Sequence, residues 1–170
     1  FNKKTNAIRI VNSLKGIDCS SIQRKGNYIW IGSSHLGVFK VDRRNGRIVR
    51  HYTTTSKDVS LPNNEIRYVY VDSHDRLWIS IPYNGLYVIN EGAKTIKKYD
   101  YNEGLTNTSV TSISEDSSGM LWVGTFNGLF RYDPKTELFV RFDEDEDIAS
   151  VFTYNASVFY GNNVYMGSLK

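Results

Sequence analysis

Short apolar-rich runs separated by polar turn residues follow one another along the whole chain of 170 residues. The order is clearest in the last third, where Asn127 and Gly128 stand between two such runs. Asn-Gly favours a two-residue hairpin turn, because that turn needs positive φ angles that these residues adopt at little cost. No segment has the period of an amphipathic helix. The pattern therefore predicts a four-stranded antiparallel unit, with strands at residues 109–115, 120–125, 129–133 and 137–142.

This unit is repeated. Residues 116–130, around Trp122, have earlier copies around Trp78 (residues 72–87) and Trp30 (residues 25–39). The tryptophans stand 48 and then 44 residues apart. That spacing is close to one four-stranded blade of a β-propeller and exceeds the period of leucine-rich and most helical repeats. We therefore predict an all-β protein built of propeller blades.

The apolar pattern of the second strand in each copy indicates that the blades pack on one another. Residues 77–79 and 121–123 are apolar at consecutive positions, whereas a strand with one wet face would alternate. Both faces must then be covered, and in a propeller the preceding and following blades do this. Gly32 and Gly124 in these strands would let a neighbouring backbone come close.

Alignment of the copies predicts partial blades at both ends. Residues 1–11 align with 132–142 without a gap, and Tyr165 takes the place of the tryptophan in the last copy. We expect three complete and two partial blades, as in a fragment of a larger propeller. A four-bladed ring and a swapped dimer are alternatives, because an unclosed array exposes an apolar blade face that needs cover. The expected units are outer strands of a preceding blade at 1–17, blades at 18–60, 61–104 and 105–147, and the first two strands of a further, partial blade at 148–170.

Composition narrows the function classes. Hydrophobic residues make up 40% of the chain and aromatic residues 14%, which suits an all-β globular protein. The formal charge is only +3, and the arginines at 43–50 fall on an expected outer strand without interleaved aromatics, so we expect no nucleic-acid contact. The one cysteine, Cys19, excludes an intrachain disulfide and aligns with core positions. No apolar run is long enough for a membrane span, and no membrane contact is expected.

Residues for catalysis or metal binding do not converge in the sequence. His35, His51 and His74 lie in different strands or turns, and no zinc-binding or nucleophile motif is present. The acidic run 143–147 lacks the glycine and the bidentate glutamate of a calcium loop, and we interpret it as a solvated connection. We therefore expect no enzyme activity, no metal and no cofactor. A propeller lyase or glycosidase would need convergent carboxylates or a Tyr and His set.

One rim of the predicted propeller offers a different kind of site. His35, Tyr83 and Phe126 each stand two residues before the glycine of a second-to-third strand turn. Rings at repeated positions can stack on sugars or on a partner's side chains, although they can also simply cover the blade ends. The blade-linking loops expected on the same rim, at 54–64, 101–108 and 143–150, carry many Asn, Ser, Thr and acidic residues.

The combined motifs resemble a known family. Residues 61–67 before Asp72, residues 103–107, 116–125 and 127–129 together are similar to the two-component regulator propeller repeat. The resemblance implies the periplasmic sensor region of a hybrid two-component system, with two seven-bladed propellers, an immunoglobulin-like domain, a membrane span, a histidine kinase, a receiver and a DNA-binding region. Ser80 departs from the expected glycine. The family supplies no ligand-contact residue to carry over.

The expected function follows from this resemblance and from the rim residues. We expect a non-catalytic periplasmic propeller, in a protein anchored in the inner membrane, that detects an oligosaccharide and signals to a cytoplasmic histidine kinase. Self-association or the remaining blades of the same protein are the expected protein contacts. The alternative is a scaffold whose rim binds protein and no small molecule.

Overall fold

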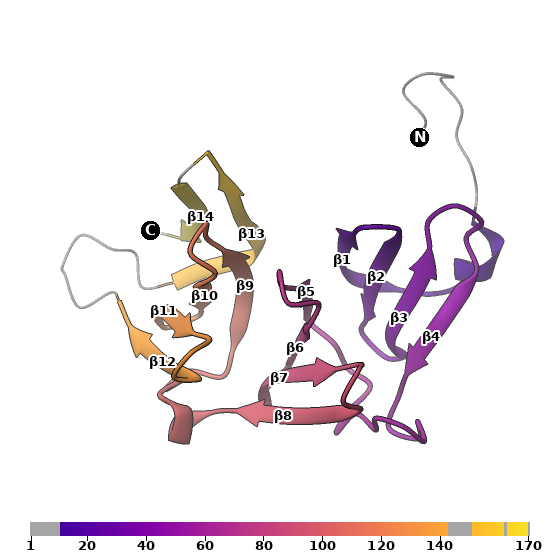
Figure 1. The fold of residues 1–170 in the computed structure, drawn as a ribbon, viewed down its shortest axis with the longest axis horizontal. Helices are drawn as coiled ribbons and strands as arrows, with labels where there is room; N and C mark the ends of the chain where they lie inside the picture. The colour runs from indigo at the N-terminus through magenta and orange to yellow at the C-terminus, as the bar shows by residue number, and fades with distance from the viewer. Residues whose placement is uncertain (1–10, 143–150, 162, 170) are drawn as a thin grey trace.

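The protein is an all-β array of sheets in a computed structural model that describes residues 11–142, 151–161 and 163–169. Three four-stranded antiparallel sheets and one two-stranded hairpin fan out around a common centre (Figure 1). In each four-stranded sheet, the strands are neighbours in sequence order. Strands β1, β5, β9 and β13 lie innermost, and β4, β8 and β12 lie at the periphery (Figure 1). This is the blade arrangement of a propeller.

The strands fall at the positions that the repeat predicts. The first sheet holds β1 (Cys19–Lys25), β2 (Tyr28–Ser33), β3 (Gly37–Asp42) and β4 (Ile48–Tyr52). The second holds β5 (Tyr68–Val71), β6 (Leu77–Ile81), β7 (Gly85–Asn90) and β8 (Thr95–Tyr99). The third holds β9 (Val110–Glu115), β10 (Leu121–Thr125), β11 (Gly128–Asp133) and β12 (Leu138–Arg141). The hairpin consists of β13 (Val151–Tyr160) and β14 (Asn163–Leu169).

Two short 3-10 helices complete the described elements. The helix η1 (Asn12–Leu14) precedes the first sheet, where Leu14 and Ile17 pack against its outer side. The helix η2 (Tyr101–Glu103) lies in the loop between the second and third sheets. Of the strands predicted at 1–17, residues 1–10 lie outside the described part of the chain, and residues 11–17 hold η1 and its flanking turns in place of a strand.

The hydrophobic core lies between the sheets. Every residue of β6 is buried, as its consecutive apolar positions predict. One cluster joins the first two sheets around Trp30 and Tyr52, and a second joins the second and third sheets around Trp78 and Tyr99. Each sheet therefore depends on its neighbour for the cover of its apolar faces.

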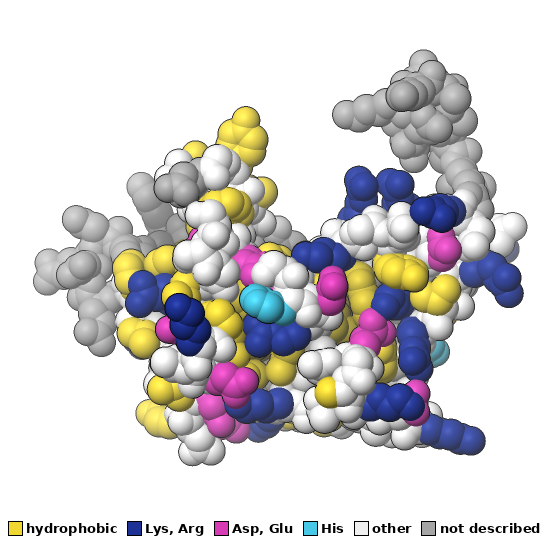
Figure 2. All heavy atoms as spheres, viewed as in Figure 1, with side chains coloured by type: hydrophobic (Ala, Val, Ile, Leu, Met, Phe, Trp, Pro, Cys, Tyr) yellow, Lys and Arg dark blue, Asp and Glu magenta, His cyan; other side chains and the backbone are white. Residues whose placement is uncertain are grey.

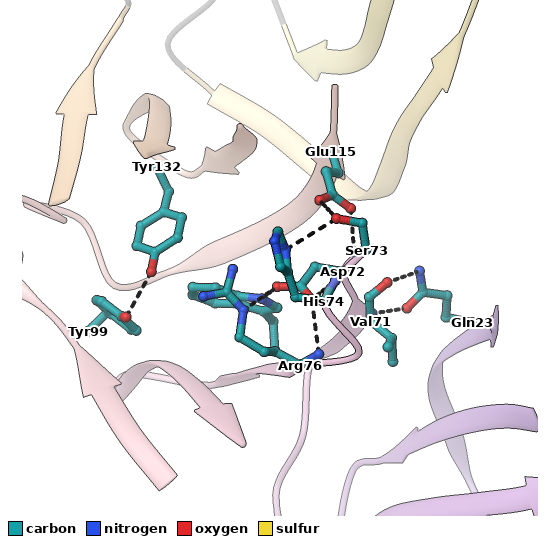
Figure 3. Close-up of polar contacts among 10 residues, drawn as sticks. Gln23, Val71, Asp72, Ser73, His74, Arg76, Tyr99, Glu115 and Tyr132 are labelled. Atoms are coloured by element: carbon teal, nitrogen blue, oxygen red, sulfur yellow. Dashed lines mark hydrogen bonds and ion pairs between the residues drawn. The ribbon is translucent and has the colours of Figure 1, made fainter. Parts of the chain in front are cut away.

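Side-chain hydrogen bonds to neighbouring backbone link the inner strands. The Ser21 hydroxyl accepts from the Val69 amide at 3.2 Å, and the Gln23 amide group bonds both backbone groups of Val71. Further along the array, the Tyr68 hydroxyl donates to the Ile113 carbonyl at 3.3 Å. Figure 3 shows the Gln23 contact and the link from Ser73 to Glu115. Sheets that share no strand ladder are thus held in register by polar side chains.

Gly32 and Gly124 lie in close contacts, but side chains and not the predicted backbone approach them, and one cysteine also departs from prediction. A methyl group on Gly124 would lie 2.9 Å from Cβ of Phe152 and from Cε of Met166, and one on Gly32 would lie 2.9 Å from Ile66. Side chains of the next sheet, rather than its backbone, make this approach. Cys19 is exposed, so the prediction of a core cysteine is wrong. It lies at the first position of β1, where the strand's pairing with β2 is irregular and its side chain is left uncovered.

Aspartates at the start of the turn between first and second strands anchor two of the tryptophans. Asp116 accepts from the indole nitrogen of Trp122 at 2.8 Å and from the backbone of Ser118 and Met120. Burial opposes ionisation of the Asp116 carboxyl, but these hydrogen bonds together outweigh it and lower its pKa. The Asp-x-x-Gly motif is therefore a structural device that orients the tryptophan.

The lowered pKa predicts a pH effect on stability. A carboxyl with a folded pKa below its unfolded value contributes stability above the unfolded pKa and loses it as the pH falls through the folded pKa. We expect Asp116→Asn to lower the unfolding free energy more at pH 7 than at pH 3, as measured by urea denaturation at both values. Equal losses at the two pH values would contradict this role of the Asp116 charge.

Candidate ligand-binding rim

The turns between second and third strands and the loops between sheets lie on one rim, as predicted. The Gly37 amide donates to the Asn64 carbonyl at 2.9 Å, which ties the first such turn to the following loop. The Phe126 amide donates in the same way to the Ser109 carbonyl at 3.2 Å. An antiparallel meander places both kinds of connection at the same end of the strands. The sequence-predicted ring positions therefore share this rim.

Tyr83 is the most exposed large apolar side chain of the rim. Its side chain is 93% exposed, although tyrosine usually buries much of its ring. Its φ angle is +57°, in the left-handed region that costs a non-glycine residue about 1–2 kcal/mol. The residue follows Pro82 in the turn between β6 and β7. An exposed ring held by a strained backbone points to a role outside folding.

Phe126 lies in the corresponding turn of the next sheet, between β10 and β11. Its side chain is 41% exposed and meets the ring of Tyr154 edge to face, with centroids 5.1 Å apart. Tyr154 belongs to β13 and is itself 42% exposed. This edge-to-face geometry is favourable for aromatic pairs, and both rings stay partly exposed.

Arg67 adds a charge to these rings. Its guanidinium carbon lies 5.2 Å from the centroid of Tyr154, within cation–π range. The Arg67 amide donates to the Ser80 carbonyl at 2.8 Å, which holds the residue at the start of the second sheet. Its side chain also reaches Glu65 at 3.5 Å and stays partly exposed. The guanidinium can therefore donate further hydrogen bonds to a ligand.

Together these residues line one shallow depression, which we call the rim cluster. The depression has a volume of about 30 Å³, so a ligand would lie on it rather than inside it. Its rings come from the second sheet, the third sheet and the hairpin, and the cluster is defined by Arg67, Tyr83, Phe126 and Tyr154. Such a surface suits flat ligands that present both apolar faces and hydrogen-bonding groups.

The structure brings two of the three predicted ring positions together and leaves the third apart. His35 is exposed in the turn between β2 and β3, outside the lining of the depression. Near it, the Ser33 hydroxyl donates to Asp18 at 2.5 Å and lowers the pKa of that carboxyl, with a smaller contribution from the His35 charge. His35 therefore lies outside the rim cluster as the described residues define it.

The polar residues of the first linking loop bind one another. The Thr54 amide donates to the Asn64 side chain at 2.8 Å, and the Ser60 hydroxyl donates to the Thr54 carbonyl at 2.6 Å. The second linking loop is ordered by η2, where Asp100 and Glu103 form a capping box. These groups stabilise loop conformation. The acidic run at 143–147, considered for calcium, lies outside the described residues.

The opposite rim is more strongly charged. In Figure 2, Lys and Arg side chains gather over the first sheet, at the right of the view. On the outer strand of this sheet, Arg50 pairs at 3.1 Å with Asp58 of the first linking loop, and Lys94 reaches the same carboxylate at 3.3 Å. Within the described ranges, no group of three His, Cys, Asp or Glu side chains is placed to hold a metal ion. No helix in that part of the chain is long and apolar enough to cross a membrane.

Comparison with known families finds matches in two parts of the chain. Residues 60–82 and 104–127 match the family described as two component regulator propeller. Both segments run from a linking loop into the turn or strand that carries a ring of the rim cluster. Comparison with curated proteins gives no significant match.

Solved structures share the blade architecture. The extracellular domain of the putative hybrid two component system BT4673 from B. thetaiotaomicron is 21% identical over 86% of the chain, with a TM-score of 0.65. That of BT3049 from the same organism is 20% identical over 99% of the chain, with a TM-score of 0.61. A streptogramin B lyase is 17% identical over 87% of the chain, with a TM-score of 0.62. The chain spans 20%, 29% and 47% of these three structures, and the likeness shows a shared fold.

Proposed function

We propose that this chain, which carries two-component regulator propeller repeats, is a non-catalytic sensing unit of a hybrid two-component signalling protein. In this proposal the unit lies in the periplasm, in a protein anchored in the inner membrane, and binds an oligosaccharide. The signal passes to a cytoplasmic histidine kinase. Support comes from the matched repeats and from fold neighbours that are extracellular domains of putative hybrid two component systems.

The observation that carries the ligand proposal is the rim cluster. Tyr83 presents a highly exposed ring at the cost of backbone strain, beside the rings of Phe126 and Tyr154 and the guanidinium of Arg67. Sugar rings combine apolar C–H faces with hydroxyl groups, so they can stack on the aromatic faces and accept hydrogen bonds from Arg67. The rings come from three different blades, so a bound oligosaccharide would favour one arrangement of the blades.

Calorimetric titration of the full-length protein with a panel of oligosaccharides tests the proposal. For the glycan that binds, we expect Tyr83→Ala and Phe126→Ala each to weaken binding about tenfold, which corresponds to a loss of about 1.4 kcal/mol. Tyr83→Gly should weaken binding equally while leaving the unfolding free energy within about 1 kcal/mol of the wild type, because glycine tolerates the positive φ angle.

Tyr160→Ala is the matched control. Tyr160 is 77% exposed but lies at the opposite end of β13, next to the turn into β14, so its loss should leave binding unchanged. Flat heats across a broad panel would overturn oligosaccharide sensing. A protein partner that binds the wild type and is lost in Tyr83→Ala would then favour the scaffold function instead.

A further inference from the structure

A second hollow lies on the opposite rim, between the first and second sheets. It has a volume of about 350 Å³, within the range of about 300–1,000 Å³ typical of small-molecule sites. The turns from β1 to β2, from β5 to β6 and from β7 to β8 bound it. Its lining includes Asn27, Tyr28, Trp30, Lys40, Asp75 and Glu91.

The next pair of sheets explains why this hollow exists. Between the second and third sheets, Tyr132 and Phe139 fill the space beside Trp78, and the ring of Tyr132 lies 4.9 Å from that of Trp78. Strand pairing places Ile89 and Ile96 at the matching positions beside Trp30. Two rings are thus replaced by shorter aliphatic side chains. The side chains beside Trp30 at the junction between the first and second sheets are therefore smaller, and the hollow lies at the rim of this junction.

The hollow presents charges of both signs next to aromatic rings. The ammonium group of Lys40 lies 4.5 Å from the ring centroid of Tyr28 and 4.7 Å from that of Trp30. It pairs with Glu91, which also accepts a hydrogen bond from the Tyr52 hydroxyl at 2.6 Å. Asp75 and Lys25 add one further charge of each sign. The donors and acceptors are therefore balanced across the hollow.

This balance limits the ligand chemistry. Two carboxylates would repel an anion and two ammonium groups would repel a cation, whereas hydroxyl groups can accept from ammonium and donate to carboxylate. Tyr28 is 38% exposed and offers an apolar surface for a ring. A cyclic molecule gains more from that surface than an open-chain polyol, because its ring is already rigid.

We infer that this hollow binds a neutral, hydroxyl-rich ring of about the size of one sugar unit. The site is separate from the rim cluster, because the turns that bound it lie at the other end of the strands. Tyr28 supplies the apolar contact, and Lys40 and Glu91 supply the hydrogen bonds. The inference extends the proposed function with a second site and does not depend on the first one.

Saturation-transfer NMR on the full-length protein tests the inference, with glucose, galactose, arabinose, myo-inositol and the open-chain sorbitol as probes. We expect at least one cyclic probe to bind and to bind more tightly than sorbitol. Tyr28→Ala should weaken that binding at least tenfold, whereas Tyr28→Phe should retain it because the ring stays in place. Thermal unfolding of each variant checks that the fold is kept.

Variants on the two rims separate this site from the rim cluster. Tyr83→Ala should leave binding of the cyclic probe unchanged, and Tyr28→Ala should leave oligosaccharide binding at the rim cluster unchanged. Absence of binding for all cyclic probes, or wild-type affinity in a folded Tyr28→Ala variant, would overturn the inference. Neither result would bear on oligosaccharide binding at Tyr83.

Discussion

Trp78→Ala is expected to lower the unfolding free energy by about 3–5 kcal/mol, which is the usual cost of removing a fully buried aromatic side chain. Trp78 is 0% exposed. Its ring stacks on Tyr99 with centroids 5.4 Å apart and meets Tyr132 edge to face. The substitution would open a cavity at the centre of the cluster that joins the second and third sheets. Chemical denaturation followed by circular dichroism measures the loss.

Trp122→Ala provides the matched control from the same repeat position. Trp122 is only partly buried, and its ring contact is Phe142, at a centroid distance of 4.9 Å. We therefore expect a clearly smaller loss of stability than for Trp78. Equal losses would show that burial between sheets does not set the contribution of each tryptophan. Trp78→Phe keeps most of the ring volume, so it should recover much of the stability that Trp78→Ala loses.

The strands were predictable because their signals are local. Consecutive apolar residues in β6 predicted burial on both faces, which the structure confirms. Asn127 and Gly128 predicted a hairpin turn before β11, but Gly128 already pairs with Thr125, so Phe126 and Asn127 form the turn, and of the Asn-Gly pair only Gly128 has a positive φ angle. Both features depend only on neighbours in sequence. The exposure of Cys19 was predicted wrongly, because alignment with core positions of other copies says nothing about the irregular pairing at the start of β1.

The rim cluster was only half predictable. Tyr83 and Phe126 were found because they recur at one position of the repeat, which periodicity reveals. Tyr154 and Arg67 have no such signal, since one lies in β13 and the other precedes β5. Their contact is visible only in the folded structure, where the hairpin places the ring centroid of Tyr154 5.2 Å from the guanidinium carbon of Arg67. The same periodicity predicted His35, which lies outside the depression because its blade contributes no residue to it.

Sequence alignment alone also does not reveal that the junctions between neighbouring sheets hold side chains of different size. The register of the strands is needed to match Ile89 with Tyr132, and the hollow lies at the rim of the junction that has the smaller side chain. A repeat protein can thus keep its blade plan while single substitutions at one junction change how much space remains there. The Asp–Trp hydrogen bond recurs in the second and third sheets, whereas the rim residues differ between copies.

Asp72→Ala is the second substitution with a large expected effect, about 3–5 kcal/mol, because it breaks a buried ion pair and leaves one partner uncompensated. The Asp72 side chain is 0% exposed and accepts from Arg76 Nε at 2.7 Å and from the Trp78 indole nitrogen at 2.8 Å. Figure 3 shows this carboxylate beside the Arg76 guanidinium. Its loss leaves a largely buried guanidinium and an indole N–H without their acceptor, and urea denaturation measures the result.

Asp116→Ala distinguishes the stability contributed by the Asp72–Arg76 ion pair from that contributed by the hydrogen bonds of the turn. Asp116 occupies the same repeat position and accepts a hydrogen bond from the indole nitrogen of Trp122. It is more exposed than Asp72, and its described hydrogen bonds come from the neutral groups of Ser118, Met120 and Trp122. We expect its removal to cost about 1–2 kcal/mol, as for a few neutral hydrogen bonds at a partly solvated site. If the two alanine variants lose the same stability, the Arg76 pair contributes nothing beyond the turn. A larger loss for Asp72 means that its ion pair with Arg76 stabilises the fold beyond the hydrogen bonds of the turn.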